Sequence, residues 1–189
     1  MKDSITLSID TLGSETKIKD ICHGLNLSSE RNINFKYLFY GNENDLKKNI
    51  SKFKRLIKVS EVIECDEVVE MTDIPSEAIK NKKKSSMSQA IESVSKKHSD
   101  AALSFGNTGA LMTFALLMIK TLSGIRRPSI ASIWPNLSGD SIILDLGANT
   151  KQDSRFLIDN ALLGSSLASI LFQIDKPSIG LLNVGTEKN

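Results

Sequence analysis

A short run of small and polar residues at positions 104–110 has the composition of a phosphate-binding turn. It lies between a strand-like segment and a long apolar segment, and its two glycines allow a tight turn with a ligand close to the backbone. A helix that starts at residue 107 or 108 would present unpaired N–H groups and partial positive charge to an anion. An ordinary strand-to-helix turn uses the same residue types, so this run alone leaves both interpretations open. Its candidate ligand-contacting residues are Ser104, Gly106, Asn107, Thr108 and Gly109.

Two more loops with glycine and polar residues follow strand-like segments, at positions 145–149 and 183–187. In open α/β sheets, ligands bind at the carboxyl ends of the strands. Each loop alone could be an ordinary connection, but three of them in one chain favour a composite site. The candidates from these two loops are Asp145, Gly147, Asn149, Asn183 and Gly185.

A further helix start is predicted near Ser86. Met87, Ala90, Ile91 and Val94 have the spacing of one helix face, and Ser86 with a glutamine three residues later forms a capping-box pattern. Lys84, Ser85 and Ser86 could bind an anion at this helix start, and simple capping is an equally good interpretation of the serine. The lysines at 80 and 82–84 follow an acidic stretch, which is typical of solvated faces; an acidic partner or an anionic substrate is the alternative.

Motifs for other chemistries are absent from the sequence. The phosphate loop of nucleoside-triphosphate enzymes, the dinucleotide fingerprint and the nucleophile elbow do not occur. Two cysteines, Cys22 and Cys65, and two histidines, His23 and His98, are too few for a cysteine zinc site or a histidine-rich metal centre. We therefore expect no metal and no cofactor, and we interpret the cysteines as reduced, buried thiols.

The elements that must position these residues alternate between strand and helix patterns. This alternation predicts an α/β fold, with a mainly parallel sheet and helices on both faces. Helices are expected from residue 86, from residue 107 or 108 to about Gly124, and from about 153 to 172. Strands are expected at 5–10, 35–40, 58–64, 101–104, 129–134, 141–145 and 178–182.

The composition is that of an ordinary globular domain. Hydrophobic residues make up 40% and charged residues 24% of the 189 residues, and the net charge of +2 lacks the concentrated basic excess of nucleic-acid binders. No secretory signal opens the sequence, and the apolar segment 110–119 is shorter than the roughly 20 residues that span a membrane. We expect a cytoplasmic protein that does not bind nucleic acid.

From about residue 70 onward, several segments in order resemble the PlsX family of phosphate acyltransferases. The strongest are SFGNTGA at 104–110 and DLGAN at 145–149, accompanied by 73–79, 84–87, 124–128 and 181–187. The family usually opens with a D-x-M-G-G-D loop, whereas residues 10–15 here read DTLGSE and keep the first acid and one glycine.

The resemblance implies transfer of a fatty acyl group from acyl-[acyl-carrier protein] to inorganic phosphate, giving acyl phosphate for phospholipid synthesis. It also implies a fold like that of phosphotransacetylases and isocitrate dehydrogenases, a homodimer when the chain has full length, and peripheral association with the inner face of the membrane. Family chains continue well beyond the segment at 183–187. On this basis, residues 1–189 are expected to form a single, incomplete acyltransferase domain from the N-terminal portion.

The proposed chemistry needs no catalytic triad. Phosphate is already an anionic nucleophile, and a thiol of pKa about 8.5 leaves with little acid assistance. Catalysis would depend on positioning and on oxyanion stabilisation, with the turn at 106–109 holding phosphate and Asn149 and Asn183 donating to the carbonyl oxygen. Arg126 and Arg127, with the lysines at 80–84, could dock the acidic carrier protein. A coenzyme A-dependent phosphate acetyl- or butyryltransferase and an inactive anion-binding fragment are the alternatives.

Overall fold

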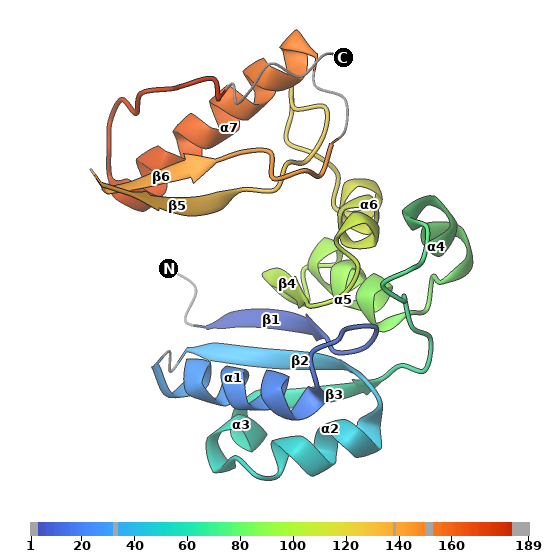
Figure 1. Ribbon diagram of the computed structural model, residues 1–189. Coiled ribbons are helices and arrows are strands. Elements are labelled where there is room, and N and C mark those ends of the chain that lie inside the picture. Colours follow the sequence, from blue (N-terminus) through green and yellow to red (C-terminus); the bar gives the residue numbers. More distant parts are fainter. Residues whose placement is uncertain (1–3, 32–33, 138, 150–152, 183–189) are drawn as a thin grey trace. The chain divides into compact units, whose positions relative to one another are not determined.

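The computed structural model describes residues 4–31, 34–137, 139–149 and 153–182. They divide into two compact units, the first up to Lys120 and the second from Thr121. Each unit has its own sheet (Figure 1).

The first unit contains a four-stranded parallel sheet in the order β3-β2-β1-β4 (Figure 1). The strands are short, and the first of them alternates Ile5, Leu7 and Ile9 with the polar residues Thr6, Ser8 and Asp10. Because β1 lies in the middle, its carboxyl end neighbours those of both β2 and β4. The elements of this unit are β1 (Ile5–Asp10), α1 (Ile18–Arg31), β2 (Phe35–Gly41), α2 (Glu43–Ile50), α3 (Lys54–Val59), β3 (Ser60–Glu64), α4 (Pro75–Asn81), α5 (Ser86–Ser95), β4 (Ala101–Ser104) and α6 (Thr108–Met118).

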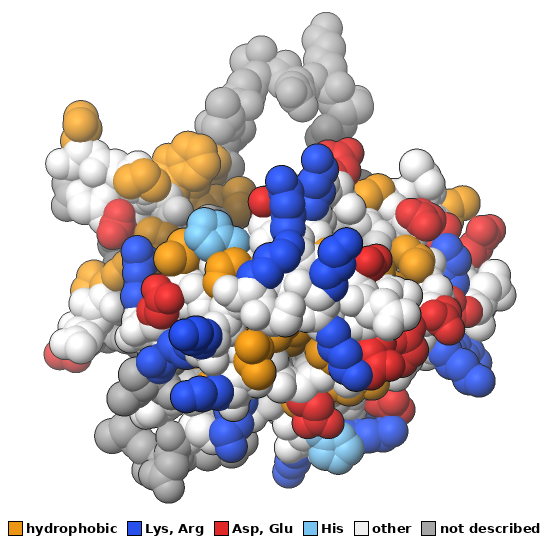
Figure 2. Space-filling model, turned by 90° about the horizontal axis from the view of Figure 1, so that it is seen from below, with side chains coloured by type: hydrophobic (Ala, Val, Ile, Leu, Met, Phe, Trp, Pro, Cys, Tyr) orange, Lys and Arg blue, Asp and Glu red, His pale blue; other side chains and the backbone are white. Residues whose placement is uncertain are grey.

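The two faces of this sheet are covered by different helices. On one face, Ile9 and Phe39 pack with buried residues of α1, α2 and α3, such as Leu25. Seen from that side, the outer surface carries both basic and acidic side chains (Figure 2). On the other face, α5 lies against β1, β2 and β4, and α6 packs on α4 and α5 around Met87 and Phe114. Side chains alternate along a strand, so Ser8 and Asp10 face α5 while Ile9 faces α1.

The second unit contains an antiparallel pair, β5 (Ser132–Asn136) and β6 (Gly139–Ile143), and the helix α7 (Ser154–Phe172). The side chain of Asp153 caps α7 by accepting a hydrogen bond from the Phe156 N–H at 2.8 Å. By length and composition, α7 is the one helix in the described ranges apolar enough to cross a membrane, a test that a core helix of a soluble protein also passes. Asp159 of α7 is fully buried and pairs with two arginines of this unit.

Several elements differ from the sequence-based expectations. The strands expected at 129–134 and 141–145 form a hairpin and are antiparallel, because the connection between them is far too short for a parallel crossover. Residues 178–182 form no strand, and no partner strand lies beside them in the described part of the chain. The expected strand at 58–64 begins only at Ser60, because the preceding residues belong to α3. The helix expected to end near Gly124 ends at Met118, and left-handed Lys120 follows it.

Candidate functional site

The carboxyl ends of β1 and β4 meet at a buried carboxylate, Asp10. Ser86 donates its hydroxyl to Asp10 Oδ1 at 2.5 Å, and Ser104 donates to Oδ2 at 2.6 Å. Ser104 Oγ also accepts a hydrogen bond from the Gly106 N–H at 3.1 Å. Asp10 therefore links the start of α5 to the turn that precedes α6.

Sequence reasoning did not include Asp10 among the site residues. Asp10 is 1% exposed. Its burial raises the pKa of the carboxyl, against the opposing effect of the hydrogen bonds from Ser104, Ser86 and the Leu12 N–H. One sequence feature could have identified it: Ser8 and Asp10 alternate with apolar residues and form a polar face in a strand that is buried on both sides.

Asn107 anchors the predicted phosphate turn to the protein rather than pointing free into it. Its Oδ1 accepts from the Ala110 N–H at 3.0 Å and so caps α6. Its Nδ2 donates to the carbonyl oxygens of Glu70, Met71 and Asp73, at 3.3, 3.0 and 2.9 Å. Both ends of this side chain are used within the protein, so the geometry favours a positioning role.

Thr108 and Gly109 are exposed in this turn, as is Phe105. Thr108 and Gly109 are the first two residues of α6, where backbone N–H groups have no partner within the helix. A further loop closes on the turn, since the Cβ position of Gly106 lies 3.5 Å from the Gly13 carbonyl oxygen. Gly13 has a φ of +68°, and a Cβ there would lie 1.9 Å from the Val69 carbonyl oxygen, so only glycine fits. Three loops thus meet at this edge of the sheet.

The start of α5 is held by internal hydrogen bonds. Ser85, not Ser86, is the capping residue: its Oγ accepts from the Ser88 N–H at 3.3 Å and donates to the Lys82 carbonyl at 2.8 Å. The capping box predicted from Ser86 is therefore wrong by one residue, because the hydroxyl of Ser86 is drawn to Asp10. Both serines are buried, whereas Lys84 is exposed. An anion at this helix start would meet the lysine and not the hydroxyls.

The loop at 145–149 belongs to the second unit and folds around Asp145. The Asp145 carboxylate accepts hydrogen bonds from the N–H groups of Ile130, Ala148 and Asn149, at 3.2, 3.3 and 2.7 Å. The Asn149 Nδ2 donates to Asp145 Oδ2 at 3.0 Å and to the Pro128 carbonyl at 3.2 Å. Gly147 is exposed, with a φ of +84°.

The composite site predicted from three loops stays a prediction. The turn at 104–109 lies in the first unit and the loop at 145–149 in the second. Asn183 and Gly185 lie outside the described residues. What the structure brings together within one unit is Asp10, Ser86, Ser104 and the turn that follows Ser104.

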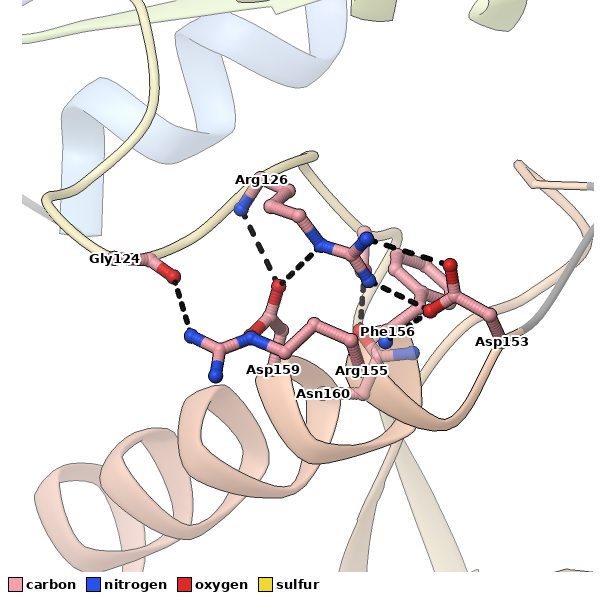
Figure 3. Close-up of polar contacts among 8 residues, drawn as sticks. Gly124, Arg126, Asp153, Arg155, Phe156, Asp159 and Asn160 are labelled. Carbon is pink, nitrogen blue, oxygen red and sulfur yellow. Dashed lines mark hydrogen bonds and ion pairs between the residues drawn. The ribbon is translucent and has the colours of Figure 1, made fainter.

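Arg126, predicted to be a docking charge, is exposed but makes its ion pairs within the second unit (Figure 3). Its guanidinium contacts both oxygens of Asp153, at 2.6 and 3.3 Å, and its Nε lies 3.6 Å from Asp159 Oδ2. Arg155 Nε lies 3.2 Å from the other oxygen of Asp159. This contact is an ion pair, but its geometry is not that of a hydrogen bond. The neighbouring Arg127 is also exposed.

Residues 5–189 match the profile of a family described as fatty acid synthesis protein. The chain belongs to this family. It is 40% identical over its whole length to phosphate acyltransferases of Azorhizobium caulinodans and Rhodopseudomonas palustris, and covers 53% and 54% of those proteins. The chain thus spans about half the length of the curated relatives that it matches. The predicted resemblance to phosphate acyltransferases is confirmed.

A solved structure supports the predicted fold. The chain resembles a phosphotransacetylase from Streptococcus pyogenes with a TM-score of 0.68 at 14% sequence identity, over 93% of this chain and 56% of that one. The parallel sheet with helices on both faces, predicted from the alternating pattern, is confirmed for this member of the fatty acid synthesis protein family.

The loop that receives Asn107 carries a testable ion pair. Lys82 Nζ lies 2.5 Å from Asp73 Oδ2, and this contact, with the Glu70 N–H, holds the pKa of Asp73 below its usual range. A carboxyl with a lowered folded pKa adds stability above its unfolded pKa and loses it as the pH falls through the folded pKa. Lys82→Met should therefore raise the Asp73 pKa in a ¹³C NMR titration, while Lys83→Met, at an exposed neighbour, leaves it unchanged. An Asp73 titration that Lys82→Met does not move would contradict this account.

Proposed function

We propose that this chain carries the phosphate site of an enzyme that transfers a fatty acyl group from acyl-[acyl-carrier protein] to inorganic phosphate. The observation that carries the proposal is the meeting of Asp10, Ser104 and the exposed start of α6 at the carboxyl ends of two parallel strands. Family membership supports the reaction class, because the curated relatives are named phosphate acyltransferase.

Phosphate would bind at the start of α6. The backbone N–H groups of Thr108 and Gly109 and the Thr108 hydroxyl are the donors, and the helix adds partial positive charge there. Asn107 and the loop at 70–73 hold this geometry in place. A donor set fixed before binding favours an anion because little further ordering is needed.

In the reaction, a phosphate oxygen attacks the thioester carbonyl carbon. A C–O bond forms, the C–S bond of the resulting tetrahedral intermediate breaks, and the electron pair leaves with the thiolate. The phosphate proton ends on the sulfur, so the products are acyl phosphate and the free thiol of the carrier. Since neither partner needs strong acid or base catalysis, the chain's contribution is to hold the nucleophile and to neutralise developing charge.

The partners remain part of the proposal. Lys80, Lys83 and Lys84 are exposed, and an acidic carrier protein would be attracted to them. Lys82 is instead paired with Asp73. A homodimer of the longer protein, a cytoplasmic location and peripheral contact with the inner face of the membrane are proposed on the family resemblance alone.

The proposal is tested by incubating the chain with phosphate and palmitoyl-[acyl-carrier protein] or palmitoyl-coenzyme A, trapping acyl phosphate with hydroxylamine. We expect product from the carrier-protein substrate, and roughly tenfold less from Thr108→Val, which loses one donor to a charged ligand. Thr113→Val is the matched control, because the Thr113 hydroxyl donates to the Gly109 carbonyl within α6.

Turnover with coenzyme A alone would favour a phosphate acetyl- or butyryltransferase. Phosphate binding by the folded chain without any acyl phosphate would favour a noncatalytic anion-binding domain. Failure of the folded chain to bind phosphate in an isothermal titration would refute the assignment of the turn.

A further inference from the structure

The bonds around Asp10 determine which way the hydroxyl of Ser104 points. A serine hydroxyl has one proton to donate and two lone pairs that accept. The Ser104 proton is directed to Asp10 Oδ2 at 2.6 Å, and one lone pair accepts from the Gly106 N–H at 3.1 Å. The free capacity of Ser104 is therefore one lone pair, which can only accept a hydrogen bond.

Ser86 cannot replace this missing donor. Its own proton is directed to Asp10 Oδ1 at 2.5 Å, and the residue is 1% exposed. Ser104, by contrast, is half-buried and lies two residues before Gly106 in the turn. Of the two serines, Ser104 is therefore the more accessible to a ligand in the turn, and it presents an acceptor.

The negative charge of Asp10 also favours a ligand that carries a proton. Among the ion pairs of the described residues, none includes Asp10, and its other polar contact is the Leu12 N–H at 3.4 Å. A buried carboxylate without a cation beside it repels an anion through a medium of low dielectric constant. A tetrahedral anion that carries a proton reduces this cost, because it can donate to Ser104 Oγ.

We propose that Asp10 is a positioning residue that sets the anion specificity of the turn, by holding Ser104 Oγ as an acceptor for a protonated oxyanion. Near neutral pH, inorganic phosphate and arsenate carry at least one proton, whereas sulfate carries none. The site therefore takes phosphate and arsenate and rejects sulfate, although the three ions have the same shape. This proposal rests on the assignment of the turn as the phosphate site.

The test is isothermal titration of the 189-residue chain with phosphate, arsenate and sulfate at neutral pH. We expect phosphate and arsenate to bind at least about tenfold more tightly than sulfate. Phosphate and arsenate gain a hydrogen bond to Ser104 Oγ, whereas the oxygen of sulfate is repelled by the lone pair there. In Asp10→Asn, the amide can donate a hydrogen bond to the oxygen of Ser104. The hydroxyl proton of Ser104 is then free to point to the ligand, so the ratio of phosphate to sulfate affinity should fall toward one. Ser104→Ala should lose the discrimination as well.

Ser99→Ala is the matched control. Ser99 is also a buried serine with hydroxyl contacts, at 3.1 Å to Ser8 and 3.0 Å to Ser93, but it lies away from the turn. Removal of the Ser99 hydroxyl should leave the ratio of phosphate to sulfate affinity unchanged. A general loosening of the first unit would instead weaken the binding of both anions alike. The ratio thus separates an orienting role from a merely structural one.

Each result decides between two assignments. Equal binding of phosphate and sulfate by the parent chain would overturn the role of Asp10 and leave the phosphate site intact. Binding of neither anion would refute the phosphate site and this proposal together. If Asp10→Asn does not fold by circular dichroism, Ser104→Ala decides alone, and discrimination that survives in it would overturn the proposal.

Discussion

Replacement of Asn107 by alanine is expected to lower the free energy of unfolding of the first unit by about 2–4 kcal/mol. The substitution removes the cap of α6, which alone typically contributes about 1 kcal/mol. It also removes the amide that reaches the carbonyls of Glu70, Met71 and Asp73, and Asn107 is only 8% exposed. Urea denaturation followed by far-UV circular dichroism measures the loss.

Asn107→Ser separates the two functions of the side chain. Serine retains a capping oxygen for α6 but has no amide to donate to the loop at 70–73. We expect its stability to lie between those of the parent and the alanine variant, with phosphate affinity reduced in the same order. Equal stability of all three proteins would show that these hydrogen bonds contribute little.

This expectation changes how an activity assay of Asn107→Ala is interpreted. Sequence reasoning assigned Asn107 to the ligand, so that lost activity would have supported direct contact. Because its donors are occupied by backbone carbonyls, lost activity follows equally from a displaced turn. Thr108→Val is the sharper probe, since Thr108 is exposed at the start of α6.

The sequence was sufficient to predict most of the first unit. Strand β1 alternates apolar with polar residues, whereas β2 and β4 are mostly apolar, and all three appear within one residue of the expected bounds. The helix from 153 to 172 was likewise correct, because Asp153 caps it and left-handed Gln173 ends it. In these segments, local pattern and tertiary packing favour the same structure.

The second unit was less predictable because its strands are short and exposed. All five residues of β5 are exposed, so burial gives no periodic pattern to define the register or the direction of pairing. The short connection around Leu137 was the available indication of a hairpin. Apolar composition alone was also insufficient at 178–182, since a strand needs a partner for its backbone groups.

The candidate site was predictable in its loops but not in its central residue. Glycine and asparagine after a strand mark a turn, and the turn at 104–109 lies where the pattern placed it. Asp10, Ser86 and Ser104 come from segments 18 to 94 residues apart, and nothing local indicates that they meet. Only the pairing of β1 with β4 and the docking of α5 bring the two hydroxyls to one carboxylate.

The second unit should depend on Asp159, and Asp159→Asn is expected to destabilise it by about 2–3 kcal/mol. Asp159 is fully buried and is the anion between Arg126 and Arg155, while the Arg126 N–H also donates to it at 3.3 Å (Figure 3). The asparagine has nearly the same size but no charge, and its amide would face two guanidinium groups. The expected cost is below that of a fully buried pair because both arginines are about half exposed.

The single tryptophan, Trp134, lies in β5, whereas both tyrosines lie in the first unit, so tryptophan fluorescence reports unfolding of the second unit selectively. Asp153→Asn is the matched control. It removes a charge from the same Arg126 but retains an oxygen to cap α7, and Asp153 is largely exposed. We expect a much smaller shift of the fluorescence midpoint for Asp153→Asn than for Asp159→Asn. Equal shifts would mean that charge around Arg126, rather than burial of Asp159, determines the stability of this unit.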